Sequence, residues 1–83
     1  MATSDDVKSI LGNVLQLGPS RTEKLAPNTQ LLGGLPELDS MAVLTVIAAI
    51  EDNFGITIQD DEVTTANFET VGSLTDFVQR KLA

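Results

Sequence analysis

The sequence predicts an all-α fold, a four-helix bundle with three long helices, one short helix and a long loop between the first and second helices. Three observations predict it. Apolar residues recur with helical spacing near the beginning, in the middle and at the end of the chain. Glycine and proline cluster between the first two of these stretches. The one short alternating stretch, Ile56-Thr57-Ile58, has no second strand beside it in the sequence and is expected to be an extended connector.

The length of 83 residues predicts a single domain, 1-83. A chain of this size buries only about 60 to 65% of its unfolded surface, so its core is small. The hydrophobic fraction of 42% is nevertheless ordinary for a globular protein, and we expect the chain to fold as a monomer without a partner.

The first helix is expected to end at Gly18-Pro19, and a long loop without regular structure is expected from residue 18 to residue 38. The helix has apolar residues at period near 3.6: Val7, Ile10, Leu11, Val14, Leu15 and Leu17. Long loops in compact domains are usually functional or held down by their own apolar residues. Four leucines are candidates for this role: Leu25, Leu31, Leu32 and Leu35.

The second helix should begin at Asp39 or Ser40 and end at Asn53 or Phe54, with Gly55 as the left-handed closing residue. Its helical wheel has two stripes. The first is expected to face the core and contains Val43, Leu44, Ile47, Ile50 and Phe54. The second is small, almost uncharged and expected to be exposed to partner proteins; it contains Met41, Thr45, Ala48 and Asp52.

The remaining elements are a short helix and a long one. Asp60-Asp61-Glu62 is expected to open a short helix that reaches about Ala66, because the helix dipole tolerates acids there. Thr70 or Ser73 is expected to cap the last helix, whose apolar positions are Val71, Leu74, Phe77, Val78 and Leu82.

Composition excludes several function classes. The net charge of −7 would repel nucleic acid and anionic membrane surfaces. Cysteine and histidine are both absent, which removes thiolate chemistry, the commonest metal ligands and the commonest general base, so an independent enzyme and a metal site are not expected. The polar, acidic start is unlike a secretory signal, and the apolar run from Met41 to Ile50 is too short for stable membrane insertion; we expect a cytoplasmic protein.

Ser40 is the candidate functional residue. The start of a helix offers unpaired backbone N–H groups and a positive dipole end, so a phosphate ester on a serine there would be stabilised. The preceding Asp39 would repel that phosphate, so its expected role is to support the modifying reaction, for example through a metal ion of a partner protein. Asp-Ser before an apolar run is also the pattern of a plain helix cap, and the residues alone leave that alternative open.

Around this serine the sequence resembles the acyl carrier protein family. The resemblance runs through essentially the whole chain and is carried by Leu38-Asp39-Ser40-Met41, Leu44, Ile47, the run from Ile50 to Ile56, Ile58, Asp60-Asp61-Glu62, Phe68, Thr70 and Val71. It implies that Ser40 carries covalent 4'-phosphopantetheine and that acyl groups are held on the arm as thioesters. It also implies a carrier without catalytic activity, which is modified by a phosphopantetheinyl transferase, loaded by an acyl ligase or transferase, and recognised by downstream acyl-processing enzymes.

The sequence also departs from the family pattern. Carriers of bacterial fatty acid synthesis commonly have an acid two residues after the serine, where this chain has Ala42. We therefore expect partner proteins to recognise a largely apolar surface. It consists of Met41, Leu44, Thr45, Ala48 and Asp52. The run Pro36-Glu37-Leu38-Asp39-Ser40-Met41 is similar to that of stand-alone carriers, which implies an acyl or aminoacyl cargo in a specialised lipid, polyketide or exopolysaccharide-linked pathway.

Two other functions compete with the carrier. A small helical protein-interaction module would use the exposed stripe without any prosthetic group, and a hydrolase using Ser40 would lack its usual histidine base. The acids Asp60-Asp61-Glu62 point in different directions on a helix and are expected to be solvated rather than to bind metal. Phe54, Phe68 and Phe77 are expected to be core residues that could also line a cargo cavity.

Overall fold

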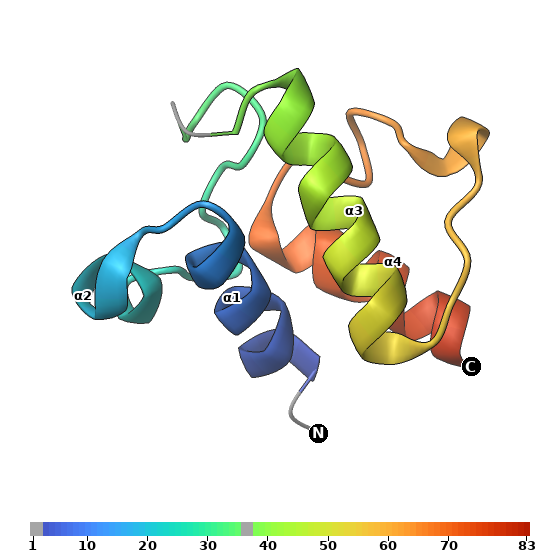
Figure 1. Ribbon diagram of the computed structural model, residues 1–83, viewed down its shortest axis with the longest axis horizontal. Helices are drawn as coiled ribbons and strands as arrows, with labels where there is room; N and C mark the ends of the chain where they lie inside the picture. Colours follow the sequence, from blue (N-terminus) through green and yellow to red (C-terminus); the bar gives the residue numbers. More distant parts are fainter. Residues whose placement is uncertain (1–2, 36–37) are drawn as a thin grey trace.

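The computed structural model describes residues 3–35 and 38–83, and these residues form an all-helical fold, as predicted. In chain order the elements are α1 (Thr3–Val14), α2 (Gly18–Glu23), α3 (Ser40–Phe54), a single 3-10 turn η1 (Asp60–Glu62) and α4 (Val71–Leu82). Helix α1 packs against each of the other three α-helices and forms the centre of the arrangement (Figure 1). None of the helices in the described part of the chain is both long and apolar enough to cross a bilayer.

The core is formed where α1, α3 and α4 meet, together with residues from the connections. Its fully buried side chains are large and apolar: Val7, Leu11, Leu31, Val46, Ile50, Phe68, Val71, Leu74 and Val78. Phe68 and Phe77 lie in a tilted arrangement with ring centroids 6.4 Å apart, a favourable geometry for an aromatic pair. The predicted core role of these two rings is confirmed, whereas Phe54 is only half-buried against the core.

The prediction of an irregular loop after Gly18 is wrong for its first part, because Gly18–Glu23 is helix α2. Gly18-Pro19 looked like a stop signal but begins this helix. Proline is tolerated in a first helical turn because its missing N–H would have no partner there. The Thr22 hydroxyl donates to the Gly18 carbonyl at 2.7 Å, within the same short helix.

Gly12 explains how α1 and α2 approach each other so closely. Its Cα faces the side chain of Thr22, and a Cβ at this position would overlap the Thr22 Oγ1 and lie 2.8 Å from Cγ2. Glycine inside a helix costs conformational free energy, but here it lets the backbone of α1 contact the Thr22 side chain of α2.

The leucines of the later part of the predicted loop pack into or against the core, as expected. Leu25 and Leu31 are buried, and Leu32 and Leu35 pack half-buried against the core. The loop is also tied to the entrance of α4 by an isolated antiparallel bridge between Gln30 and Thr70. Backbone N–H groups donate across it from Leu31 to Glu69 at 2.7 Å and from Val71 to Thr29 at 3.0 Å.

The predicted short helix from Asp60 to about Ala66 is also wrong, because only the three-residue turn η1 forms. Side-chain hydrogen bonds hold this turn in place. The Asn67 amide donates to the Glu62 carbonyl at 2.9 Å, and the Glu62 carboxylate accepts the Gln59 N–H at 2.9 Å. The short helix of the bundle is therefore α2, before α3 rather than after it.

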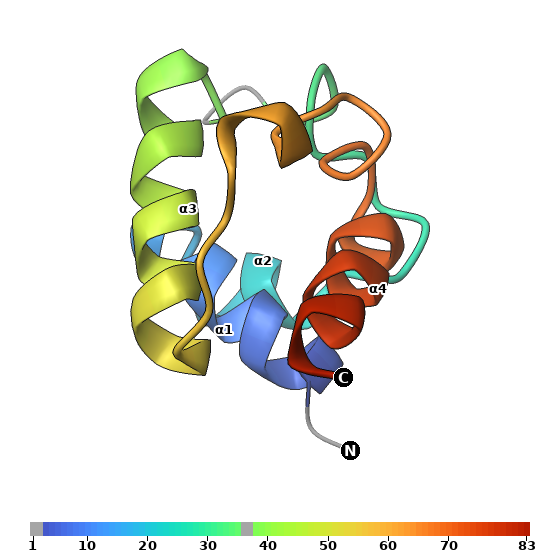
Figure 2. The same ribbon diagram turned by 90° about the vertical axis from the view of Figure 1, so that its right-hand side faces the viewer.

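The connection between α3 and α4 runs alongside both helices (Figure 2). Ile56-Thr57-Ile58 is extended without forming a strand, as predicted, and the Ile58 N–H donates to the Glu51 carboxylate at 2.8 Å. At the other end, Lys81 of α4 forms an ion pair with Glu62 at 3.0 Å. Helix α4 begins with a capping box in which the side chains of Thr70 and Ser73 accept each other's backbone N–H groups, each at 3.0 Å, which confirms the predicted cap.

Candidate prosthetic-group attachment site

The site is the N-terminus of α3 and the residues that lead into it. Leu38 is buried, and its N–H donates to the Leu35 carbonyl at 3.0 Å, so the chain enters the helix from an anchored turn. Asp39 then adopts an extended backbone, with φ −91° and ψ −177°. The predicted boundaries of this helix are confirmed, including Gly55 as a left-handed closing residue with φ 66°.

Ser40 is the first residue of α3, and its side chain is exposed. The first backbone N–H groups of a helix have no intrahelical acceptor and carry the positive end of the dipole. The first turn of α3, all of it described, contains no acidic side chain. A phosphate ester on the Ser40 oxygen therefore fits this position sterically and electrostatically, with Asp39 as the one neighbouring carboxylate described.

Asp39 is the N-cap of α3. Its Oδ1 accepts the Ala42 N–H at 2.8 Å, and its backbone carbonyl accepts the Val43 N–H at 2.9 Å. The structure thus gives Asp39 the capping role that the sequence left open as an alternative. Its side chain remains exposed, so the support of a modifying reaction stays a prediction beside this structural role.

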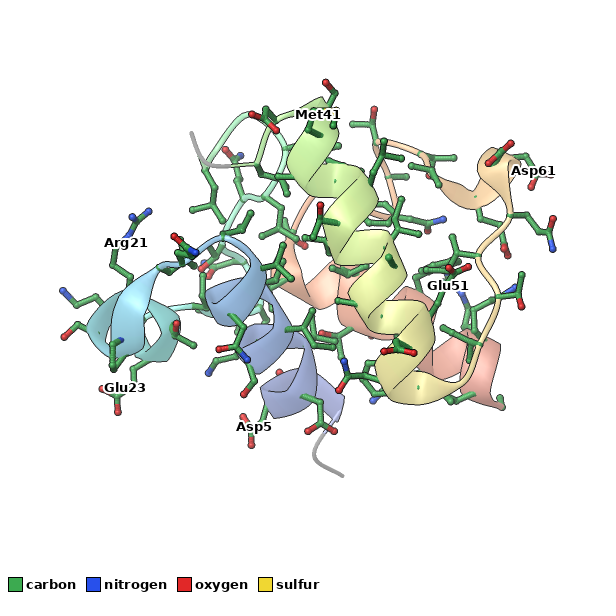
Figure 3. The ribbon with its side chains drawn as sticks, in the orientation of Figure 1. Asp5, Arg21, Glu23, Met41, Glu51 and Asp61 are labelled. Atoms are coloured by element: carbon green, nitrogen blue, oxygen red, sulfur yellow. The ribbon has the colours of Figure 1, made fainter. Side chains whose placement is uncertain are left out.

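The predicted partner surface lies on the outside of α3. Met41 is 72% exposed and Leu44 is 62% exposed, the two largest exposures among the exposed large hydrophobic side chains. Thr45, Ala48 and Asp52 are exposed as well, and Figure 3 shows Met41 projecting at the beginning of the helix. The five residues therefore form one accessible surface, although whether partners bind it stays a prediction.

The first, core-facing stripe of this helix was predicted with the wrong centre. Leu44 was expected in the core but is exposed, whereas Val46, which was not in the stripe, is 1% exposed. The run from Met41 to Ile50 is apolar on nearly every side, so its periodicity does not define which side packs inward. Ala42, where carriers of bacterial fatty acid synthesis commonly have an acid, is half-buried against the core.

One of the three acids of η1, Glu62, has structural partners. Glu62 lies beside Lys81, whose Nζ is 3.0 Å from Oε1 and 3.2 Å from Oε2. The hydrogen bond from the Gln59 backbone, then the hydrogen bond from Lys81, lower the pKa of the Glu62 carboxyl below its usual value. In the described residues, no three acidic side chains are grouped to hold a metal ion.

Comparisons with known proteins agree with this geometry. Residues 5–78 match the family described as "Phosphopantetheine attachment site". The acyl carrier protein of Thermosynechococcus vestitus is 32% identical over 79 residues, which cover 95% of this chain and 90% of that protein. The acyl carrier protein of Wolinella succinogenes is 28% identical over 79 residues, covering 95% of this chain and 96% of that protein.

A solved structure gives the same result for the fold. The solution structure of holo acyl carrier protein from Nitrosomonas europaea superimposes with a TM-score of 0.89 at 49% identity, covering 99% of this chain and 98% of that one. The cofactor of this chain is thus covalent 4'-phosphopantetheine. With an attachment domain that spans most of its length and the helical fold that goes with it, the chain belongs to the acyl carrier protein family.

Proposed function

We propose that Ser40 is the attachment residue for 4'-phosphopantetheine and that the protein presents acyl groups to partner enzymes. The observation that carries this proposal is the exposed Ser40 hydroxyl at the first residue of α3, where the helix favours an attached phosphate. Ser40 directly follows the Asp39 cap in the sequence, and a serine hydroxyl forms a stable phosphoester.

The residues around the site have distinct tasks. The Ser40 oxygen forms a new bond to phosphorus while the nucleotide portion of the donor leaves, and the hydroxyl proton passes to the transferase. Asp39 holds the helix start in place and offers an exposed carboxylate to the transferase or its metal ion. The bound group supplies a terminal thiol for thioesters, which this cysteine-free chain lacks.

Partner enzymes dock on the outer surface of α3 that contains Met41, Leu44, Thr45, Ala48 and Asp52. They are a phosphopantetheinyl transferase, an acyl-loading ligase or transferase, and downstream acyl-processing enzymes. The four residues of this surface nearest Ser40 are uncharged, so apolar contacts rather than ion pairs dominate this docking. A surface of this kind favours a specialised lipid, polyketide or exopolysaccharide-linked pathway.

In this proposal the protein is a monomeric, single-domain carrier in the cytoplasm with no catalytic activity of its own. It acts with proteins only, because its charge of −7 opposes contact with nucleic acid. Its partners perform every chemical step on the cargo.

The decisive experiment is co-expression with a broad-specificity phosphopantetheinyl transferase, followed by intact mass measurement. The wild type should gain the mass of one phosphopantetheine group, and Ser40→Ala should gain none. The matched control is Ser20→Ala, an exposed change on α2, which should leave the gain intact. A gain that persists in Ser40→Ala would disprove the assignment.

Membership in a phosphopantetheine-attachment family argues against the alternative of an interaction module without a prosthetic group. The exposed Met41 and Leu44 would suit such a module too. The two functions differ in one result: only a carrier loses its ability to accept an acyl group when Ser40 is replaced.

A further inference from the structure

A polar hollow of about 660 Å³ lies between α1 and α2. Four exposed polar side chains line it: Ser9, Asn13, Gln16 and Glu23. Ser9 and Asn13 also line a second hollow of about 160 Å³, which lies between α1 and α3 and includes Asp6. Because the two hollows share Ser9 and Asn13, they form one groove across α1. We call it the α1 groove; it reaches Glu23 on one side and Asp6 on the other.

The charge of the α1 groove is negative only. Glu23 lines the larger hollow and Asp6 lines the smaller one, and none of the described residues that line them is basic. Lys8, the one basic residue of α1, lies outside both linings. Figure 3 shows Arg21 and Glu23 projecting from α2 in opposite directions, so Arg21 does not bring positive charge to the groove.

The end of α1 adds to this negative charge. A helix has the negative end of its dipole at its C-terminus, where a cation is favourable. The last turns of α2 and α4 have basic residues, whereas the last turn of α1, which the structure describes completely, has none. Asn13 belongs to this last turn and lines both hollows. The start of α2 also borders the groove, but this helix has only six residues and begins with Pro19, which lacks an N–H, so it opposes the effect weakly.

Gln16 places a polar side chain in the groove at a position that favours glycine. Its φ of 53° is the only positive φ of a non-glycine residue in the described chain. The Leu17 N–H donates to the Gly12 carbonyl at 3.0 Å, a helix ending that usually has glycine at the position of Gln16. The helix ending explains this backbone but not the side chain, because glycine adopts a positive φ without strain. Strained residues cluster at binding sites, so the Gln16 amide is a candidate ligand contact.

The acceptors of the groove suit a guanidinium group. The Glu23 carboxylate and the amide carbonyls of Asn13 and Gln16 can all accept hydrogen bonds, and within the described residues none of these side chains takes part in a hydrogen bond or ion pair. A guanidinium group has five N–H donors in a planar fork, so it can satisfy several acceptors around one positive charge, which a compact ammonium group does less well.

The size and walls of the larger hollow indicate that its occupant is a chain segment. Its volume equals the share of roughly 22 water molecules in the liquid, far more than one guanidinium group fills. Small-molecule pockets are mostly apolar, whereas these walls are polar and exposed. Arginine is enriched in the interfaces between proteins, where such a segment would supply it.

We propose that the α1 groove is a docking surface for an arginine-bearing segment of a partner protein. The guanidinium group pairs with Glu23 and is held by the amides of Asn13 and Gln16, while the segment crosses α1 towards α3. The net charge of −7 attracts such a segment. This inference goes beyond the proposed function and does not depend on it, because no residue that lines the groove belongs to the attachment site around Ser40.

The test follows the backbone amide resonances of the isotope-labelled full chain by NMR while a capped tripeptide, with arginine between two glycines, is added. The control peptide has citrulline in place of arginine, which has nearly the same shape without the charge. The arginine peptide should shift the resonances of Ser9, Asn13, Gln16 and Glu23, and the citrulline peptide should not. Equal shifts with the two peptides would overturn the inference.

Two variants and a matched control locate the binding. Glu23→Gln should raise the dissociation constant about 2- to 5-fold, the range expected for an exposed ion pair. Glu69→Gln makes the same change at an exposed acid outside the groove and should leave the dissociation constant unchanged. Asn13→Lys supplies the cation that the end of α1 lacks, so it should be at least as stable as the wild type in thermal unfolding and should lose the shifts at Ser9 and Gln16.

Equal binding by the wild type, Glu23→Gln and Asn13→Lys would refute the groove, as would shifts spread over acidic residues elsewhere in the chain. Guanidinium chloride at the same ionic strength should bind more weakly than the tripeptide, and equal affinity would show that the groove holds a lone cation rather than a segment. Ser40→Ala should bind the arginine peptide as the wild type does. A failure of phosphopantetheine attachment therefore leaves this inference standing, and a failure of peptide binding leaves the proposed function standing.

Discussion

The Asp39 carboxylate accepts the Ala42 N–H at 2.8 Å, so the residue just before the candidate serine also caps the helix that presents it. One side chain thus has a structural task and, in our proposal, a task in modification. Substitutions that keep the cap and remove the charge can separate these two tasks.

Asp39→Asn should keep the cap, because asparagine accepts the same N–H about as well as aspartate does. Asp39→Ala should lose it and lower the free energy of unfolding by about 1 kcal/mol, measured by urea denaturation. If the charge supports modification, both variants should be modified by the transferase more slowly than the wild type. Normal modification of a stable Asp39→Asn protein would leave Asp39 with the cap alone.

Gly12→Ala should destabilise the packing of α1 against α2, because the added Cβ overlaps the Thr22 side chain. Overpacking of this kind typically costs about 1 to 3 kcal/mol, which thermal or urea unfolding would measure. Adding Thr22→Ala removes the overlapping Oγ1 and Cγ2 atoms and should recover part of the loss. Were Gly12→Ala as stable as the wild type, the close approach of these helices would be in error.

The Glu62 carboxylate should make stability depend on pH in the acidic range. Its pKa is lowered in the folded protein, so its contribution is fully present above the usual value of 4.5 and is lost as the pH falls through the lower, folded value. Wild-type melting temperatures should therefore drop more steeply than those of Glu62→Gln as the pH decreases below about 4.5.

Lys81→Met serves as the partner control, because it removes the second contributor to this lowered pKa and leaves the Gln59 hydrogen bond. Its pH dependence should lie between those of the wild type and Glu62→Gln. Identical acid profiles for the wild type and Lys81→Met would show that the Glu62–Lys81 contact does not persist in solution.

Met41→Glu and Leu44→Glu should weaken docking of the transferase without unfolding the protein, because both side chains are exposed. A residue at the centre of an interface typically contributes enough to raise KM roughly tenfold when it is lost. Leu82→Glu places the same charge on another exposed leucine, 45% exposed at the end of α4, and should leave KM unchanged. Equal effects at all three positions would indicate a response to net charge rather than a docking surface.

The sequence predicts α3 and α4 well because their ends are encoded locally. Asp39, Gly55 and Thr70 each match a cap whose chemistry is independent of the rest of the fold. Likewise, the exposed position of Ser40 follows from its place beside Asp39 at the first turn. The position of the candidate site can therefore be predicted from the sequence without knowledge of the tertiary packing.

The parts that the sequence did not predict depend on tertiary contacts. Helix α2 has only six residues and is placed by the approach of Gly12 to Thr22, a contact with no local pattern. The exposure of Leu44 and the burial of Val46 depend on how α3 is rotated against α1, which an almost uniformly apolar run does not specify.

The bridge between Gln30 and Thr70 joins two positions separated by almost half of the chain. Closing so long a loop is slow compared with forming a helix, so this contact raises the sequence separation that folding must overcome. The residues that deliver the chain to Ser40 are consequently held in place from the opposite end of the polypeptide. A fragment of the chain that ends before Thr70 would therefore contain Ser40 but lack the bridge that ties down the loop leading towards it.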